Sequence, residues 1–186
     1  MTMRVVVGGI PGVGKSTVVD ELRGRLGARL EIVNYGTVMM EEARLRGAGN
    51  RDEMRRLPAQ VQREIQASAA GKIAAMPAEF LLVDTHFSIR TPQGYLPGMP
   101  SHVVSALSPD ALAVIAASPE EISSRRAADS TRIREASLES VREELEMERL
   151  FAVAASNESG APLAIILNRQ GEAARAASEL AAVLGV

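Results

Sequence analysis

A glycine-rich segment directly after the first apolar run constrains the fold of this chain more than any other feature. Its residues, Gly9–Thr17 (GIPGVGKST), match the pattern G-x-x-x-x-G-K-S, in which glycines let the backbone wrap tightly and turn its N–H groups toward phosphate. The apolar run Arg4–Gly8 precedes the segment, and the helical pattern Lys15–Leu26 follows it. This order predicts a phosphate-binding loop (P-loop), with the positive end of the helix dipole facing the phosphate. A chance glycine-rich turn is the alternative, but the flanking elements that the motif requires are both present.

Five short apolar runs, each bounded by turn residues, predict the strands. The runs do not alternate with polar residues, which is typical of strands buried on both faces of a sheet. Helical patterns lie between them, so the chain is predicted to be an α/β protein of the P-loop NTPase type, with a five-stranded parallel sheet and helices on both faces. The predicted strands are Arg4–Gly8, Leu30–Asn34, Phe80–Asp84, Ala111–Ala117 and Leu163–Asn168, and the predicted helices are Lys15–Leu26, Val38–Arg46, Pro58–Met76, Pro119–Ala128, Ser137–Ser156 and Glu172–Leu184.

Chain length and the gaps between the strands set the expected domain organisation. The 186 residues suit one domain, spanning residues 1–186. The stretch 36–76 is too long for one crossover helix and predicts an inserted subdomain of two or three helices. Residues 126–136 predict a short lid, and the stretch 85–101, rich in proline and glycine, predicts a structured loop.

Composition excludes several kinds of chemistry. The absence of cysteine removes disulfides, thiol catalysis, zinc–thiolate sites and iron–sulfur clusters. A net charge of −2 argues against nucleic acid or an anionic membrane as a partner. The sequence contains no apolar run long enough to span a membrane and no signal-peptide pattern, so we expect a cytoplasmic protein. Lys15 and Lys72 are the only lysines among 21 basic residues, and one of them falls in the P-loop.

Two groups of residues are expected to handle the phosphates and a metal ion. In the P-loop, Lys15 should reach the β- and γ-phosphates of ATP, Ser16 should offer its hydroxyl to Mg²⁺, and Thr17 can contact the α-phosphate. Asp84 ends an apolar strand, where a carboxylate would hold Mg²⁺ through water. The alternative for Asp84 is a carboxylate that only caps the turn after the strand.

Missing motifs narrow the class of P-loop protein. Asn168-Arg-Gln-Gly171 is the nearest match to the base-reading Asn-Lys-x-Asp of GTPases, and it lacks both the lysine and the aspartate. The chain also lacks the Leu-Ser-Gly-Gly-Gln signature of transport cassettes. Four arginines within residues 125–134 favour a small-molecule kinase, because phosphoryl transfer needs converging cations and a closing lid. A solvated helix end followed by a charged loop is the alternative for these arginines.

Taken together, several segments resemble the archaeal-type adenylate kinases over nearly the whole chain. The resemblance implies reversible, Mg²⁺-dependent transfer of the terminal phosphoryl group of ATP to AMP, giving two ADP. It also implies an AMP-binding insertion, a short lid and a homo-oligomer, commonly a homotrimer. The segments are Gly9–Thr17, Val33-Asn-Tyr-Gly-Thr-Val38, Asn50–Leu57, Val83-Asp-Thr-His86, Thr91–Gly98, Asp129–Arg134 and Asn168–Gly171.

The resemblance also assigns roles to individual residues. ATP is expected to contact Gly9, Ile10, Pro11, Gly12, Val13, Gly14, Lys15, Ser16, Thr17 and the loop that begins at Asn168. AMP is expected to contact Asn34, Thr37, Arg51, Arg55, Arg56 and the basic residue Arg90. The catalytic set is expected to be Lys15, Asp84, Arg126, Arg132 and Arg134, with Ser16 and Asp84 at the metal.

Two other functions remain open from the sequence. One is a small P-loop kinase with a different nucleotide or metabolite as acceptor, and the other is a nucleotide-binding module that turns over little. The remaining acidic pairs, such as Glu41–Glu42 and Glu143–Glu144, are expected on solvated helix faces. His86 could touch substrate or could serve only as a hydrogen-bonded loop residue.

Overall fold

The centre of the molecule is a parallel sheet built around β1 (Met3–Gly8). The computed structural model, which describes residues 2–129 and 137–186, contains a five-stranded sheet in the order β2-β3-β1-β6-β7. All of its pairings are parallel, so the carboxyl ends of its strands meet at one end of the sheet. The predicted fold class is therefore confirmed. The other four strands are β2 (Leu30–Asn34), β3 (Phe80–Asp84), β6 (Ala111–Ala116) and β7 (Leu163–Leu167).

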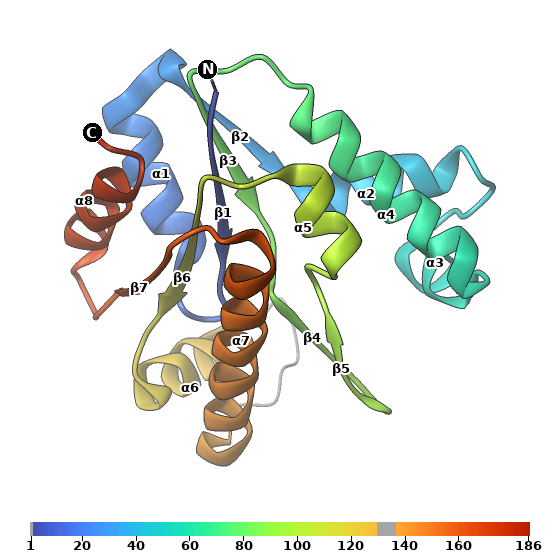
Figure 1. Ribbon diagram of the computed structural model, residues 1–186. Helices are drawn as coiled ribbons and strands as arrows, with labels where there is room; N and C mark the ends of the chain where they lie inside the picture. Colours follow the sequence, from blue (N-terminus) through green and yellow to red (C-terminus); the bar gives the residue numbers. More distant parts are fainter. Residues whose placement is uncertain (1, 130–136) are drawn as a thin grey trace.

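Helices cover both faces of this sheet (Figure 1). Val5 and Val7 of β1 pack into one core with α1 and α8, whereas Val6 packs into a second core with α4, α5 and α7. Successive side chains of a strand point to opposite faces, so a strand covered on both sides reads as a continuous apolar run. The covering helices are α1 (Lys15–Leu26), α4 (Ala59–Ala74), α5 (Ser101–Leu107), α7 (Leu138–Ser159) and α8 (Ala173–Val183), and α6 (Pro119–Ala128) follows β6.

Three helices lie between β2 and β3 and form a lobe with a small core of its own. They are α2 (Tyr35–Arg44), α3 (Arg51–Arg56) and α4 (Ala59–Ala74). The side-chain oxygen of Asn34 accepts a hydrogen bond from the N–H of Thr37 at 3.0 Å, which starts α2 three residues before the predicted Val38. The core of this lobe contains Met40, Ala43, Ala48 and Ile65.

A buried carboxylate joins the first and last helices of this lobe. Glu42 on α2 is only 3% exposed, forms an ion pair with Lys72 on α4, and accepts a hydrogen bond from Ser68 Oγ at 2.6 Å. The expectation that Glu42 lies on a solvated face was therefore wrong. Arg46 Nη1 is a third partner, at 3.4 Å from the Glu42 carboxylate. Together the three partners satisfy a charge that would be costly to bury alone.

The stretch 85–101 is more regular than the sequence predicted. It contains an antiparallel hairpin of β4 (Ser88–Thr91) and β5 (Gly94–Pro97), in which Ile89 pairs with Leu96. Helix α5 then begins at Ser101, directly after Pro100. Four-residue strands give little periodicity, and prolines at the ends of a strand look like loop residues, so the pattern suggested a loop.

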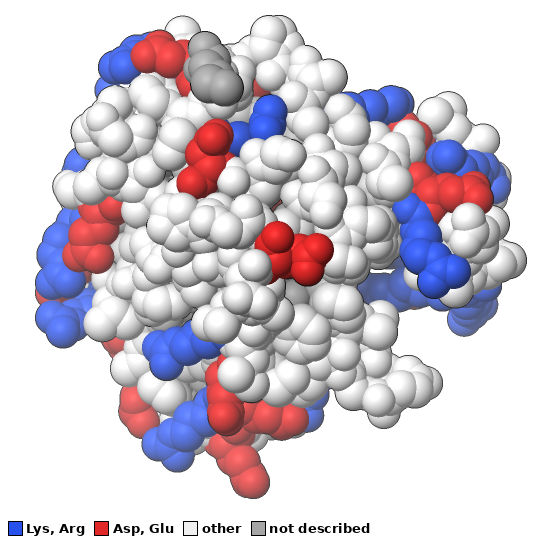
Figure 2. Space-filling view, viewed as in Figure 1, with Lys and Arg blue, Asp and Glu red and all other residues white. Residues whose placement is uncertain are grey.

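The surface carries charges of both signs. In the space-filling view, basic and acidic side chains gather together over the inserted helices, while the middle of this face is largely uncharged (Figure 2). Within residues 2–129 and 137–186, no helix combines the length and the apolar character needed to cross a membrane.

Candidate active site

The P-loop wraps between the end of β1 and the start of α1. Gly14 has φ of 80°, a left-handed conformation that favours glycine. Space excludes a side chain there as well, since a Cβ on Gly14 would lie 2.4 Å from Nδ2 of Asn168. The adjacent Val13 is buried and anchors the loop in the core. Ser16 and Thr17 occupy the exposed first turn of α1.

Side chains from two distant elements hold the carbonyl groups of this loop. Asn168 Nδ2 donates to the carbonyl of Val13 at 2.8 Å, and Arg126 Nε donates to the carbonyl of Pro11 at 2.9 Å. Arg125 Nη1 donates to the carbonyls of Gly12 and Val13 at 3.3 and 3.2 Å. With these carbonyls engaged by protein donors, the loop is preorganised to present N–H groups to an anion.

A chain of polar contacts joins the P-loop to the beginning of the inserted helices. Lys15 Nζ lies 2.6 Å from Asp84 Oδ1 and also donates to the carbonyl of Thr85. The other Asp84 oxygen accepts a hydrogen bond from Asn34 Nδ2 at 2.8 Å. Asn34 Oδ1 in turn accepts from the Thr37 N–H at 3.0 Å and from its hydroxyl at 3.2 Å. The parallel register explains the proximity, because Asn34 and Asp84 are partner positions at the carboxyl ends of β2 and β3.

The three insertion arginines of α3 differ in where they lie. A Cβ on Gly36 would lie 3.5 Å from Nη2 of Arg51 and 3.4 Å from Oδ1 of Asn34, so the Arg51 guanidinium lies beside Asn34. Arg55 forms an exposed ion pair with Asp52 at 3.1 Å, and Arg56 is exposed. Of the three, Arg51 is the one that lies beside the Asn34 end of the contact chain.

Two further arginines share one carboxylate beside the P-loop. Arg126, whose side chain is only 2% exposed, makes a two-pronged contact with Glu144 of α7, at 3.1 Å from Nη1 and 2.7 Å from Nη2. Arg90 of β4 lies 3.5 Å from the same carboxylate and donates to Ser140 Oγ. Glu144 was expected on a solvated face, and this expectation was wrong. Arg132 and Arg134 lie outside the described residues.

His86 rests against the start of the P-loop. Its Nδ1 lies 2.7 Å from the carbonyl oxygen of Gly9. A carbonyl oxygen only accepts, so Nδ1 carries the hydrogen in this contact. Desolvation lowers the pKa of His86 below its ordinary value, and the positive charge of Lys15 lowers it further. The neutral ring is therefore favoured.

Sequence reasoning missed parts of this site. It included Arg125 in an arginine-rich segment without a role of its own, although Arg125 contacts both the P-loop and the carbonyl of Asn168, at 3.4 Å. It expected the loop that begins at Asn168 to contact ATP, but not that the side chain of Asn168 holds the carbonyl of Val13. The clustering of arginines was the only signal for Arg125.

The residues present suit a magnesium ion held together with phosphate. The Asp84 carboxylate and the Ser16 hydroxyl are hard oxygen donors, and the Ser16 hydroxyl makes no hydrogen bond to any described residue. Among residues 2–129 and 137–186, no group of three or more His, Cys, Asp or Glu side chains could hold a metal alone. Magnesium does not require such a group, because it is commonly bound by one or two carboxylates, water and substrate phosphate.

The strand order, the P-loop after β1 and the arginines around it define a P-loop protein of the small-kinase type. Solved structures agree with this fold class. A shikimate kinase from Acinetobacter baumannii in complex with shikimate aligns with a TM-score of 0.61 at 16% identity, covering 99% of this chain and 93% of that one. A gluconokinase from Sinorhizobium meliloti 1021 aligns with a TM-score of 0.54 at 17% identity, covering 98% of this chain and 91% of that one.

Sequence comparison identifies the family. Adenylate kinase from Thermoplasma acidophilum is 46% identical over 186 residues, which cover 99% of this chain and 100% of the relative. Adenylate kinase from Methanocaldococcus jannaschii is 43% identical over 97% of this chain and 97% of the relative. Adenylate kinase from Pyrococcus horikoshii is 40% identical over 99% of this chain and 96% of the relative. The family described as an AAA domain also matches residues 8–143. The chain belongs to the archaeal adenylate kinase family, and the resemblance inferred from its motifs is confirmed.

Proposed function

We propose that this chain transfers the terminal phosphoryl group of ATP to AMP, reversibly and with Mg²⁺, giving two ADP. The observation that carries the proposal is the continuous contact chain from Lys15 through Asp84 to Asn34. It joins a P-loop, which suits a nucleoside triphosphate, to the start of the inserted helices, which offer a separate site for an acceptor. The adenylate kinase relatives, which align over nearly the whole chain, support AMP as that acceptor.

The P-loop binds the phosphoryl donor. Its N–H groups and the N-terminus of α1 contact the phosphates, and Lys15 exchanges Asp84 for the β- and γ-phosphates. Asp84 and Ser16 would hold a magnesium ion, which would neutralise charge on the phosphate oxygens when bound. Thr17 contacts the α-phosphate. The loop that begins at Asn168 faces the adenine.

The insertion binds the acceptor. Asn34 and Thr37 lie at the base of α2, and Arg51 lies beside them, so Arg51 contacts the AMP phosphate. Arg55 pairs with Asp52 instead and contributes little to this contact. Residues 36–76 therefore act as the AMP-binding subdomain.

Arginines stabilise the transferring group. Arg126 already lies against the P-loop at Pro11, and Arg90, the residue expected to contact AMP, lies 3.5 Å from the Glu144 carboxylate that Arg126 also contacts. A phosphoryl group in transfer spreads negative charge over its oxygens, which preorganised cations stabilise. Arg132 and Arg134, in the proposed lid of residues 126–136, complete this set.

An acceptor panel tests the proposal. The protein is incubated with ATP and Mg²⁺, with either AMP, another nucleoside monophosphate or no acceptor, and ADP formation is measured. The proposal predicts turnover that depends on AMP and exceeds the blank without acceptor. Turnover with another acceptor but not with AMP would instead indicate a kinase of different specificity. ATP binding without turnover that depends on any acceptor would indicate a non-catalytic module.

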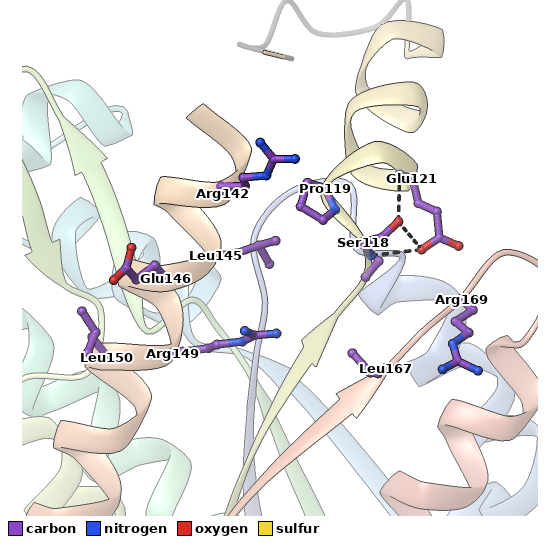
Figure 3. Close-up of a pocket in the computed structure, with 11 residues that line it drawn as sticks. Ser118, Pro119, Glu121, Arg142, Leu145, Glu146, Arg149, Leu150, Leu167 and Arg169 are labelled. Carbon is purple, nitrogen blue, oxygen red and sulfur yellow. Dashed lines mark hydrogen bonds between the residues drawn. The ribbon is translucent and has the colours of Figure 1, made fainter. Parts of the chain in front are cut away.

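We also propose that the chain forms a homo-oligomer, as its family resemblance implies, and that a groove between α7 and β7 contributes to the contact. The groove, a hollow of about 890 Å³, is lined by Leu145 and Leu150 of α7 and by Leu167 at the end of the edge strand β7 (Figure 3). Leu150 and Leu167 are 55% and 37% exposed. Its lining also includes Arg149, Arg169, Glu121 and Glu146, which carry charges of both signs and suit contact with a second copy.

Light scattering coupled to size-exclusion chromatography tests the oligomer. The wild type should elute as a trimer of the 19.8 kDa chain, and Leu150→Glu should shift it toward the monomer. Leu45→Glu is the matched control, because Leu45 is 76% exposed on the inserted helices, away from the groove. A monomeric wild type would contradict the proposal.

A further inference from the structure

Helix α7 buries a carboxylate behind the P-loop for which the proposed mechanism has no role. Glu148 is 0% exposed. Its two oxygens accept hydrogen bonds from the N–H of Phe87 at 2.9 Å, the N–H of Ser88 at 2.8 Å and the hydroxyl of Ser88 at 2.8 Å. Within the described part of the chain, no lysine or arginine forms an ion pair with it.

An acid at this position is costly for packing. Glu148 lies in the buried stripe of α7, between Leu145 and Ala152, where an apolar side chain would be expected. A buried carboxylate is tolerated when its oxygens are fully hydrogen-bonded, and here three donors satisfy it. Two of the three donors are consecutive main-chain N–H groups, so the carboxylate fixes the path of the backbone as well as one side chain.

The backbone that Glu148 fixes continues directly from the proposed catalytic residues. Asp84 ends β3, and the carbonyl of the next residue, Thr85, accepts the hydrogen bond from Lys15. The Thr85 N–H donates to the Val7 carbonyl at 3.0 Å, and the ring of His86 contacts the Gly9 carbonyl. The segment is thus tied to β1 at its beginning and to α7 at its end.

The same contact reaches the P-loop through close packing. A Cβ on Gly8 would lie 2.3 Å from the ring of Phe87 and 2.9 Å from Oε1 of Glu148. The backbone immediately before the P-loop therefore lies directly on Phe87 and Glu148, with no room for a side chain between them. A shift of Phe87 would be transmitted to the start of the loop, because packed interiors deform little.

We propose that Glu148 is a positioning residue, which fixes the main chain at Phe87 and Ser88 and thereby holds the Thr85 carbonyl and His86 in place against the P-loop. The inference rests on the proposed phosphoryl transfer. Misplacement of about 1 Å near reacting groups can cost up to about 10²-fold in rate. Loss of this contact should therefore lower kcat more than it alters substrate KM.

Glu148→Gln tests the inference most directly. The glutamine has nearly the same shape, but its NH₂ group would face one of the main-chain N–H donors and could not accept a hydrogen bond from it. We expect kcat to fall about 10-fold or more, with KM for ATP and AMP within about 3-fold of the wild type. Glu148→Asp, which keeps the charge but draws it back by one methylene, should give a smaller change of the same kind. If Glu148→Gln does not fold, Glu148→Asp takes its place in the test.

A matched control separates positioning from a loss of stability. Arg4 lies at the opposite end of β1, where its guanidinium donates to the carbonyls of Leu107, Ser108 and Ala74. Arg4→Met should lower the melting temperature and leave kcat unchanged below it. If Glu148→Gln or its aspartate replacement also lowered only the melting temperature, the inference would be overturned.

Hydrogen exchange of the wild type adds a readout that does not depend on activity. The amides of Phe87 and Ser88 should exchange as slowly as those of the strand β3 that precedes them, and rapid exchange would contradict the contact. The absence of wild-type turnover with AMP would instead refute the proposed function. The two failures can therefore be distinguished.

Discussion

Lys15 Nζ lies 2.6 Å from Asp84 Oδ1, so the lysine of the P-loop is already paired with the carboxylate at the end of the neighbouring strand. The two side chains are 12% and 27% exposed, which keeps the pair beside the solvent-accessible site instead of deep in the core. In the proposed reaction, a phosphate that enters the loop would compete with Asp84 for this lysine. Binding of the donor would therefore reorganise an ion pair that also leads, through Asn34, to the proposed acceptor side.

Replacement of Lys15 should abolish most of the activity. Lys15→Met removes one preorganised charge from the phosphates, and we expect turnover with ATP and AMP to fall about 10²-fold or more. The other lysine provides a matched control, because Lys72 lies on α4 and pairs with Glu42. Lys72→Met should lower the melting temperature but keep kcat near that of the wild type. Near wild-type turnover in Lys15→Met would refute the role of the loop.

The positions of the α3 arginines predict unequal effects on AMP. Arg51→Met should raise KM for AMP about 10-fold or more, as expected for loss of a charge-assisted hydrogen bond to phosphate. Arg55→Met, which removes an exposed ion pair with Asp52, should change KM for AMP by less than about 2-fold. Steady-state kinetics at saturating ATP measure both. A larger effect for Arg55 than for Arg51 would show that the AMP phosphate binds elsewhere.

Asn168 and Arg125 should act together on ATP binding. Both donate to the carbonyl of Val13, at 2.8 and 3.2 Å, so each supports the same part of the P-loop. Asn168→Ala and Arg125→Met should each raise KM for ATP. The double variant should lose less free energy of ATP binding than the sum of the losses in the two single variants. Strict additivity in this double-mutant cycle would indicate that the two side chains act independently.

The stability of the inserted lobe should depend on pH through Glu42. Hydrogen bonds from Lys72 and Ser68 lower the pKa of Glu42 below its ordinary value of 4.5. A carboxyl whose pKa is depressed in the folded state contributes stability above its unfolded pKa, and loses that contribution as pH falls through the folded pKa. The melting temperature of Glu42→Gln should therefore lie below that of the wild type at pH 7, and the difference should shrink below about pH 4.5. A difference that did not change with pH would contradict the ion pair.

The sequence predicted best those features that a local pattern determines. The strands around Val5–Val7 and Leu81–Val83 are continuous apolar runs, and the glycines between β1 and α1 leave few other structures possible. Their order along the chain, together with the rule that crossovers between parallel strands are right-handed, was enough to predict a parallel sheet of five strands. Asp84 was assigned to the site because it ends such a strand, whereas Asn34 was assigned through the family resemblance.

Features that depend on packing between distant elements were not predictable in the same way. Glu42 and Glu144 read as ordinary helix acids, and only the positions of α2, α4, α6 and α7 relative to one another bury them. Arg125 and Arg126 are adjacent in sequence, yet one contacts Gly12 and Val13 and the other contacts Pro11 and Glu144. One-residue differences of this kind depend on the rotation of α6 about its axis, which periodicity does not fix.

The most direct measurement starts from ADP alone. A protein with separate sites for a donor and an acceptor nucleotide, joined at Lys15 and Asp84, should convert ADP with Mg²⁺ into equal amounts of ATP and AMP, observable by phosphorus NMR. Lys15→Met should lose this conversion. An ATPase, or a kinase for a different acceptor, cannot make ATP from ADP in this way, so ADP that stays unchanged beside the folded wild-type protein would contradict the proposed function.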